Sequence, residues 1–325
     1  MTESIGTPIL WVGFTVVILT LLTLDLFVFH RKAHAVTLRE AGLWTAGWVS
    51  LALLFNAAIY VWAGSEAGLS FSAGYLVELA LSVDNMFVFA LIFGAFAVPP
   101  AYQHRVLFWG ILGALVMRFL FILVGAAMLD AFHWIIYVFG AFLVFTGIKI
   151  LRQREHTMDL EHNVALRIFR RFVPTTTEYV GQRFTIVKAG KRYATPLLAV
   201  LVLVEATDLV FALDSVPAIF AITDDPFLVY TSNVCAILGL RSLYFLLAGI
   251  MDRFHYLKLG LGAVLIFVGI KMAGAEVYKV PVAASLAVIV LLIGGSVILS
   301  LLRPQEEATE PHGHQKKLET SMQVD

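Results

Sequence analysis

The sequence predicts an all-α fold, a polytopic helical membrane protein with about nine transmembrane helices. Three observations support this class. First, 60% of the 325 residues are hydrophobic and 14% are charged, with a mean hydropathy of +0.86, which is more apolar than a soluble core requires. Second, apolar runs near or above the length of about 18 residues needed to cross hydrocarbon recur along the chain. Third, the charges between these runs are unevenly distributed.

The apolar runs give the predicted helices in order. They lie at residues 9–29, 42–63, 74–97, 106–129, 133–151, 195–221, 226–250, 256–273 and 281–302. The first run lacks a basic leading region and a small-residue cleavage site, and Arg31 and Lys32 follow it, so we expect a retained span rather than a signal peptide. The chain then divides into two N-terminal helices (1–73), a first repeat (74–151), a loop (152–194), a second repeat (195–273), a last helix (274–302) and a tail (303–325).

Basic residues are concentrated in alternate connections between the predicted helices. The loop 152–194 alone holds nine lysines and arginines, and others follow the first and the last helix. The opposite connections carry acids such as Glu66, Asp130 and Glu276. Because an excess of lysine and arginine marks cytoplasmic loops, we expect the N-terminus outside and the C-terminus in the cytoplasm.

Two acid-bearing segments show that the chain contains a repeat. Residues 78–85 (ELALSVDN) and 208–215 (DLVFALDS) share their spacing, and further on residues 147–149 (GIK) recur as 269–271. A unit of three helices begins and ends on opposite sides of the membrane, so its copy enters in the reverse direction. The sequence therefore predicts two inverted three-helix repeats, helices three to five and six to eight, with a substrate site near the midplane where they meet.

Carboxylates inside apolar helices indicate an ion pathway, because each costs several kcal/mol to insert. Glu205 lies three residues before Asp208 and adds an acid on the same helix face. Carboxylates with amide and hydroxyl neighbours form an oxygen-rich set that suits magnesium, calcium or manganese. The alternative is that protonated carboxyl groups only link packed helices. The predicted metal-ligating residues are Glu78, Asp84, Asn85, Glu205, Asp208, Asp214 and Ser215.

Arg118 and Arg241, at related positions of the two repeats, are predicted to balance part of this negative charge. Five carboxylates against two guanidinium groups leave a surplus that requires a bound cation or protonation. Pro217, three residues after Asp214, is predicted to break its helix and to free the carbonyl of Leu213 for a cation. Alternatively, the proline merely bends a packed helix.

The remaining polar features carry less information. The acidic and histidine group at 155–162 and the histidines at 312–314 are expected to be solvated, since neither matches a tight metal motif. Residues 184–194 alternate and turn near Gly190, which predicts a small hairpin. A single cysteine, Cys235, can form no internal disulfide.

The segments around the two acidic motifs resemble the signatures of the TerC family, particularly its Alx-type bacterial members. The likeness rests on residues 78–89 and 205–220 and continues through 231–249 and 269–272. It implies a multi-pass protein of the bacterial inner membrane, linked to manganese efflux, with tellurium resistance as an indirect phenotype. The acids thought essential in that family correspond here to Glu78, Asp84, Glu205, Asp208 and Asp214.

The expected function is export of divalent cations, chiefly Mn²⁺, through a midplane carboxylate site, with proton exchange inferred from burial. The alternative is an accessory or scaffold protein that delivers metal or helps to assemble other membrane or exported proteins. We expect no enzyme, because the sequence lacks a HExxH zinc motif, a GxSxG nucleophile elbow and a haem-binding histidine pair. The expected partners are the divalent ion and the lipid bilayer. No resident cofactor and no nucleic acid are expected, and the sequence does not identify protein partners.

Overall fold

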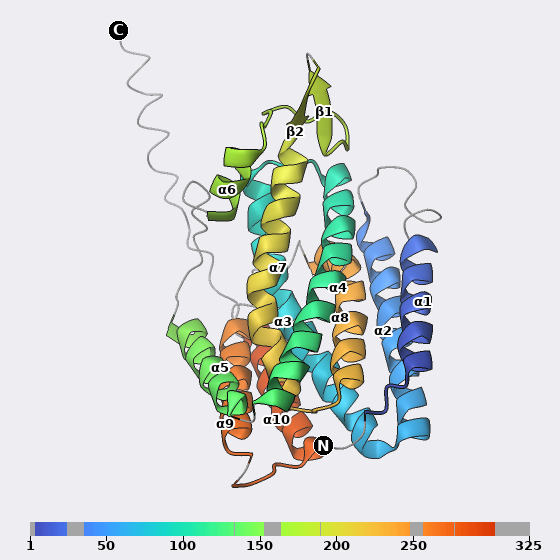
Figure 1. Cartoon of the computed structure of the whole chain (residues 1–325), viewed down its shortest axis with the longest axis vertical. Coiled ribbons are helices and arrows are strands. Elements are labelled where there is room, and N and C mark those ends of the chain that lie inside the picture. The colour runs from blue at the N-terminus through green and yellow to red at the C-terminus, as the bar shows by residue number, and fades with distance from the viewer. Residues whose placement is uncertain are drawn as a thin grey trace.

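The computed structural model describes residues 4–24, 36–132, 134–152, 164–188, 190–247, 256–275 and 277–302. These ranges form a helical bundle with a two-stranded hairpin at one end (Figure 1). The bundle helices are α1 (Pro8–Leu24), α2 (Leu38–Ala63), α3 (Ser65–Ala95), α4 (Pro100–Ala131), α5 (Ile135–Arg152), α7 (Pro196–Phe220), α8 (Pro226–Leu247), α9 (Leu257–Ala273) and α10 (Val282–Leu302). The other elements are α6 (Val164–Phe172), β1 (Thr185–Lys188) and β2 (Lys191–Ala194).

Each predicted apolar run overlaps one helix of the bundle, although the runs 9–29 and 226–250 extend beyond the described residues. In the described ranges, six helices are long and apolar enough to cross a membrane, namely α2, α3, α4, α5, α7 and α10. The two parts of α8, Pro226–Leu238 and Leu240–Leu247, meet at an angle of 42° and make a seventh span if counted together. The predicted class, a polytopic helical membrane protein, is therefore confirmed. The count of nine spans and the inverted repeat stay predictions.

Helix boundaries follow from local chemistry. Pro100 and Pro196 open α4 and α7, where the missing backbone N–H costs no helical hydrogen bond. Pro226 opens α8, and the Asp225 carboxylate caps this helix by accepting a hydrogen bond of 2.8 Å from the backbone N–H of Phe227. These caps fix the points at which the chain turns back into the bundle.

The structure corrects the predicted helix break at Pro217. This proline lies inside α7, which continues to Phe220, and the carbonyl of Pro217 accepts a hydrogen bond of 3.0 Å from the N–H of Ala221. Pro217 has no backbone N–H to donate to the preceding turn. Because it lies near the C-terminal end of α7, the missing hydrogen bond does not end the helix early. Among the described residues, a bend of 42° lies instead in α8, at Gly239.

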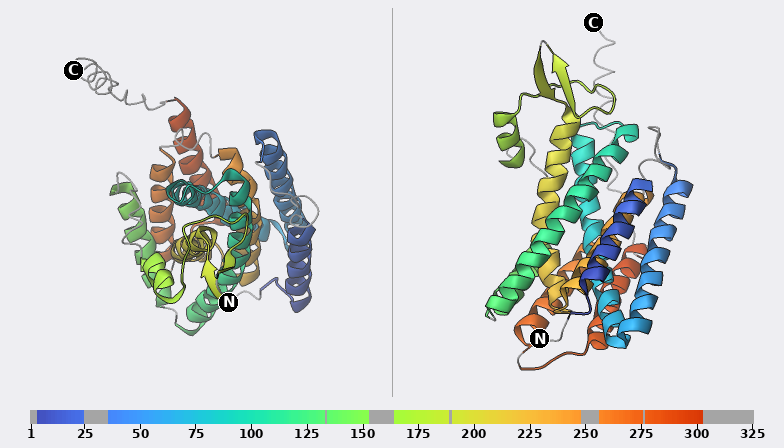
Figure 2. Two further views of the ribbon diagram at one scale, coloured as in Figure 1. Left: turned by 90° about the horizontal axis from the view of Figure 1, so that it is seen from above. Right: turned by 45° about the vertical axis from the view of Figure 1, so that its right-hand side comes forward.

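The core of the bundle is formed around α3 and α8. Most residues of α8 between Phe227 and Tyr244 are buried, as expected for a helix surrounded by others. This helix packs against α2, α3 and α4, while α7 packs against α3 and α4. Helices α1 and α2 lie at one edge of the bundle and α5 at the other (Figures 1 and 2).

Helices α5 and α9 pack closely through glycines. Gly140 lies against Gly269, and Gly147 lies against Gly262, so the two helices run antiparallel. In the sequence, Gly140-Ala141 recurs as Gly262-Ala263, and Gly147 recurs as Gly269. Gly140 therefore contacts the counterpart of Gly147, and Gly147 contacts the counterpart of Gly140. Such a reciprocal contact is what a two-fold relation between the repeats would produce. It supports the predicted inversion.

The predicted hairpin is confirmed as the antiparallel pair β1 and β2. On its exposed side Lys188 Nζ lies 2.8 Å from Glu178 Oε2, and this ammonium holds the pKa of the Glu178 carboxyl below its ordinary value. Tyr179 donates a hydrogen bond of 2.6 Å to the carbonyl of Phe96, which ties the segment before the hairpin to the end of α3. The charged group at 155–162, the tail from 303, Arg31 and Lys32 lie outside the described residues.

Candidate functional site

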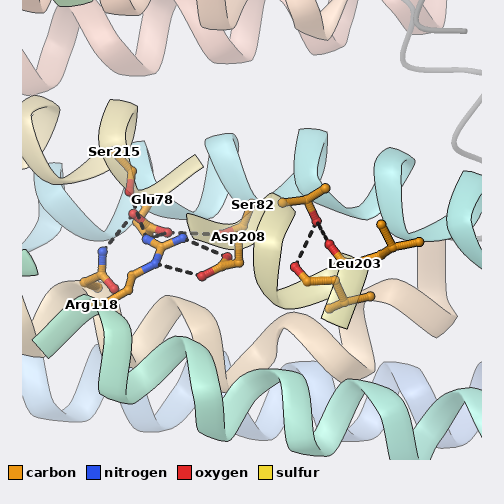
Figure 3. A network of polar contacts seen from close by, with 9 residues as sticks. Glu78, Ser82, Arg118, Leu203, Asp208 and Ser215 are labelled. Carbon is orange, nitrogen blue, oxygen red and sulfur yellow. Dashed lines mark hydrogen bonds and ion pairs between the residues drawn. The ribbon is translucent and has the colours of Figure 1, made fainter. Parts of the chain in front are cut away.

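A buried ion network joins three helices at the centre of the bundle (Figure 3). Arg118 of α4 is fully buried, and its Nη1 donates hydrogen bonds to Glu78 Oε1 on α3 and, over 2.9 Å, to Ser215 Oγ on α7. Its Nη2 lies 3.2 Å from Asp208 Oδ1, also on α7. One guanidinium thus pairs with two carboxylates, which is how a folded bundle holds such charges away from water.

Further hydrogen bonds engage the remaining oxygen of Glu78. Asn233 of α8 donates from Nδ2 to Glu78 Oε2 over 2.9 Å, and Ser82 Oγ lies 3.5 Å from Glu78 Oε1. Both oxygens of Glu78 therefore have partners in this arrangement. Glu78 and Asp208 fix Arg118 and connect the helices, so their oxygens are not open to a metal ion here.

The two other acids of the duplicated motif face a cavity of about 430 Å³. Asp84 of α3 and Asp214 of α7 both line it, although 130 residues separate them in the chain. The cavity lies between α3, α4, α5, α7 and α9. Its polar lining consists of Asp84, Asn85, Arg118, Thr146, Lys149, Thr207, Asp214 and Ser215.

Asn85 supplies an oxygen that has no partner. Its side chain lines the cavity and is 1% exposed, and its Oδ1 makes no hydrogen bond among the described residues. A buried carbonyl oxygen normally has a donor, a water or an ion beside it. An amide oxygen next to carboxylates is also a common ligand of hard divalent cations.

The other predicted site residues lie outside this cavity. The Glu205 carboxylate occupies the space that a Cβ on Gly113 of α4 would take. Arg241 Nη1 lies 3.1 Å from His104 Nε2, so the two arginines at related positions have different surroundings. Within the described ranges, no group of three or more His, Cys, Asp or Glu side chains is arranged to hold a metal. A cation at Asp84 and Asp214 would therefore need amide, hydroxyl or water oxygens to complete its shell.

Thr146 and Lys149 of α5 were not predicted as site residues. Both line the cavity, and the Asp214 carboxylate faces the Thr146 hydroxyl and is attracted electrostatically by the Lys149 ammonium. They lie three residues apart and thus on one face of α5. The signal that could have found them is the recurrence of the GIK segment, which places a lysine at the end of the third helix of each repeat.

Comparison with known proteins shows the family. Residues 63–308 match the integral membrane protein TerC family. An uncharacterized membrane protein of Myxococcus xanthus is 53% identical over 306 residues, which cover 94% of this chain and 96% of that protein. Proteins of Escherichia coli (strain K12) and Salmonella typhi, each named putative membrane-bound redox modulator Alx, are 46% identical over 296 residues, or 88% of this chain and 92% of theirs.

No solved structure matches the chain. The resemblance inferred from the acidic motifs is confirmed by the family match and by these long, similar relatives. The chain belongs to the TerC family of integral membrane proteins.

Proposed function

We propose that the protein exports divalent cations, with Mn²⁺ as the main cargo, through the cavity between Asp84 and Asp214. The observation that carries the proposal is that equivalent residues of the two acidic motifs line one cavity inside the helical bundle. The unpartnered Asn85 oxygen adds a neutral ligand beside them. Two carboxylates and several neutral oxygens form a set suited to a hard divalent ion.

The Arg118 network supports this assignment by excluding other positions. A cation beside Glu78 or Asp208 would have to displace the guanidinium that holds both carboxylates. A cation between Asp84 and Asp214 leaves that network intact. We therefore propose that Arg118, Glu78 and Asp208 form the structural framework of the site. Asp84 and Asp214 would bind the transported cation.

The finer parts of the proposal rest on the family resemblance. Oxygen ligands alone do not separate Mn²⁺ from Mg²⁺, so the choice of manganese, the outward direction and the bacterial inner membrane follow from that resemblance. We propose that metal export is coupled to proton uptake. When the metal ion leaves, the carboxylates in the apolar bundle need another positive charge to neutralise them, and protons can supply it. Tellurium resistance would then follow indirectly from altered metal content.

The name of the Alx relatives refers to redox modulation, and this chain offers one cysteine for such chemistry. Cys235 is buried in α8 and is the sole cysteine of the sequence. An intramolecular dithiol couple is therefore not available. We propose that any effect of this chain on redox state would follow from metal balance.

Cellular metal content tests the proposal. Cells under manganese challenge would express wild type, Asp84→Asn, Asp214→Asn or the control Asp130→Asn, which removes an exposed acid at the end of α4. Manganese, magnesium, iron, zinc and calcium would be measured by elemental analysis, with membrane expression checked by immunoblot. We expect wild type and Asp130→Asn to lower manganese alone, and both cavity variants to lose this effect.

Two outcomes would contradict the proposal. An unchanged metal content with well-expressed wild type would favour an accessory role over transport. Wild-type export by both Asp84→Asn and Asp214→Asn would show that the cavity is not the pathway.

A further inference from the structure

Lys149 places a positive charge in the wall of the cavity that contains both aspartates. It lies in the last turn of α5, its side chain is exposed, and it lines the cavity together with Asp84 and Asp214. The Asp214 carboxylate has this ammonium as an electrostatic partner. The wall of the cavity therefore already carries a positive charge, the Lys149 ammonium, that belongs to the protein itself.

A lysine can leave such a position without unfolding the site. Its ammonium is a compact charge on a flexible four-carbon stem, and the stem can extend along apolar surface while the charge moves toward water. Arg118 has no such freedom, because it is fully buried and paired with two carboxylates. Of the two positive charges that line the cavity, Lys149 is therefore the one whose position can change, whereas Arg118 is held in place.

An ammonium and a divalent ion repel each other and are attracted to the same carboxylate oxygens. We propose that Lys149 is a tethered competitor of the cargo, which neutralises Asp214 when the cavity is empty and withdraws toward the exposed rim when a divalent cation binds. This inference rests on the proposed function. It implies that Lys149 limits the affinity for metal, keeps the empty cavity close to neutral and helps to expel the ion.

The second repeat offers a matched control. Lys271 occupies the related position in the last turn of α9, but its electrostatic partner is Asp224, and it is not among the described residues that line the cavity. Lys271→Gln removes the same charge from a related helix end and leaves the cavity unchanged. Lys149→Arg keeps the charge, whereas Lys149→Gln and Lys149→Met remove it.

The test is Mn²⁺ binding to the purified full-length protein in lipid nanodiscs, measured by titration calorimetry. We expect Lys149→Gln and Lys149→Met to bind Mn²⁺ about tenfold more tightly than wild type, since a like charge has been removed from the site. Lys149→Arg and Lys271→Gln should keep the wild-type affinity. In proteoliposomes, Lys149→Gln should move Mn²⁺ more slowly than wild type because release is impaired.

The outcomes separate the two proposals. If wild type binds no Mn²⁺, the proposed function fails. If wild type binds Mn²⁺ and Asp214→Asn does not, but both uncharged Lys149 variants bind with equal or lower affinity, the function stands and the competitor role is wrong. Thermal unfolding of each variant identifies any that is misfolded, and the two uncharged substitutions provide independent tests.

Discussion

Arg118 holds together more buried charge than any other residue of the described network. It pairs with Glu78 and Asp208, and neither carboxylate has water-exposed surface of consequence, at 0% and 3%. Removing one partner of a buried ion pair leaves an uncompensated charge, which costs much more than the pair itself contributes. The stability of α3, α4 and α7 relative to one another should therefore depend on this guanidinium.

We predict that Arg118→Met lowers the free energy of unfolding by about 3–5 kcal/mol, the cost of breaking a buried ion pair. Chemical unfolding in mixed micelles would measure this change. Adding Glu78→Gln and Asp208→Asn to the same chain should recover part of the loss, because no unpaired carboxylate would then remain. If Arg118→Met were as stable as wild type, or if the triple variant recovered none of the lost free energy of unfolding, the network would not stabilise the bundle.

The two acids of each duplicated motif have different neighbours in the structure, as their spacing along the helix predicts. Acids six residues apart on a helix are separated by about 9 Å along it and about 120° around it. For that reason Asp84 and Asp214 face the cavity while Glu78 and Asp208 face Arg118. Glu205 shares a face with Asp208 yet packs on Gly113, a contact set by how α4 approaches α7. The spacing of residues along the chain predicts which of them share a face of a helix. It does not predict which other helix packs against that face.

The close packing of α5 against α9 depends on glycines, which have no side chain at the contact. A Cβ on Gly147 would lie 2.6 Å from the carbonyl oxygen of Gly262, and one on Gly140 would lie 2.8 Å from that of Gly269. Both obstacles are backbone atoms, so neither can rotate away. Small residues allow this close approach between membrane helices, where packing rather than hydrophobicity drives association.

We predict that Gly147→Ala destabilises the protein by about 1–3 kcal/mol, the usual cost of overpacking, and slows metal transport by displacing the Thr146 and Lys149 face of α5. Gly294→Ala in α10 is the control, because an added Cβ there has nothing within 4 Å. Unfolding and transport assays on both variants would check this. Equal behaviour of the two variants would show that the glycine contact is not tight in the working protein.

The apolar runs of the sequence indicate where the helices lie but not where they end. The predicted runs 74–97 and 106–129 correspond to α3 and α4, which have 31 and 32 residues. Hydropathy falls where a helix leaves the apolar layer, but the helix itself continues until a cap or a proline ends it. The sequence also did not predict the bend in α8 at Gly239. A proline such as Pro217 disrupts a helix by its ring and its missing N–H, whereas a glycine within an apolar run does not by itself indicate a bend.

The position of Lys149 and the charge distribution along the chain together predict which side of the membrane this wall of the cavity faces. Lys149 is exposed at the end of α5 that leads into the basic loop 152–194, which the charge pattern predicts to be cytoplasmic. If the cavity opens beside Lys149, cargo would enter from the side predicted to be cytoplasmic, which is what the proposed export requires. Helices α5 and α9 belong to the two predicted repeats and contact each other through equivalent glycines. If the two repeats exchanged conformations across this contact, the cavity would open to the other side of the membrane.

Composition sufficed to predict the fold class, and the resemblance of the two acidic segments to the TerC signatures indicated the family. The division of the acids between framework and cavity, and the presence of Lys149 beside Asp214, depend on contacts between helices distant in sequence. No periodicity within a single helix contains that information.

Transport through the cavity can be tested directly by measuring Mn²⁺ flux through the purified protein in liposomes that contain a manganese-sensitive dye. Wild type, Asp84→Asn, Asp214→Asn and Asp130→Asn would be compared at equal protein content under the same metal and proton gradients. We expect a flux with wild type and Asp130→Asn, and none above empty liposomes with either cavity variant. Equal flux in all four proteins, or none with wild type, would contradict it.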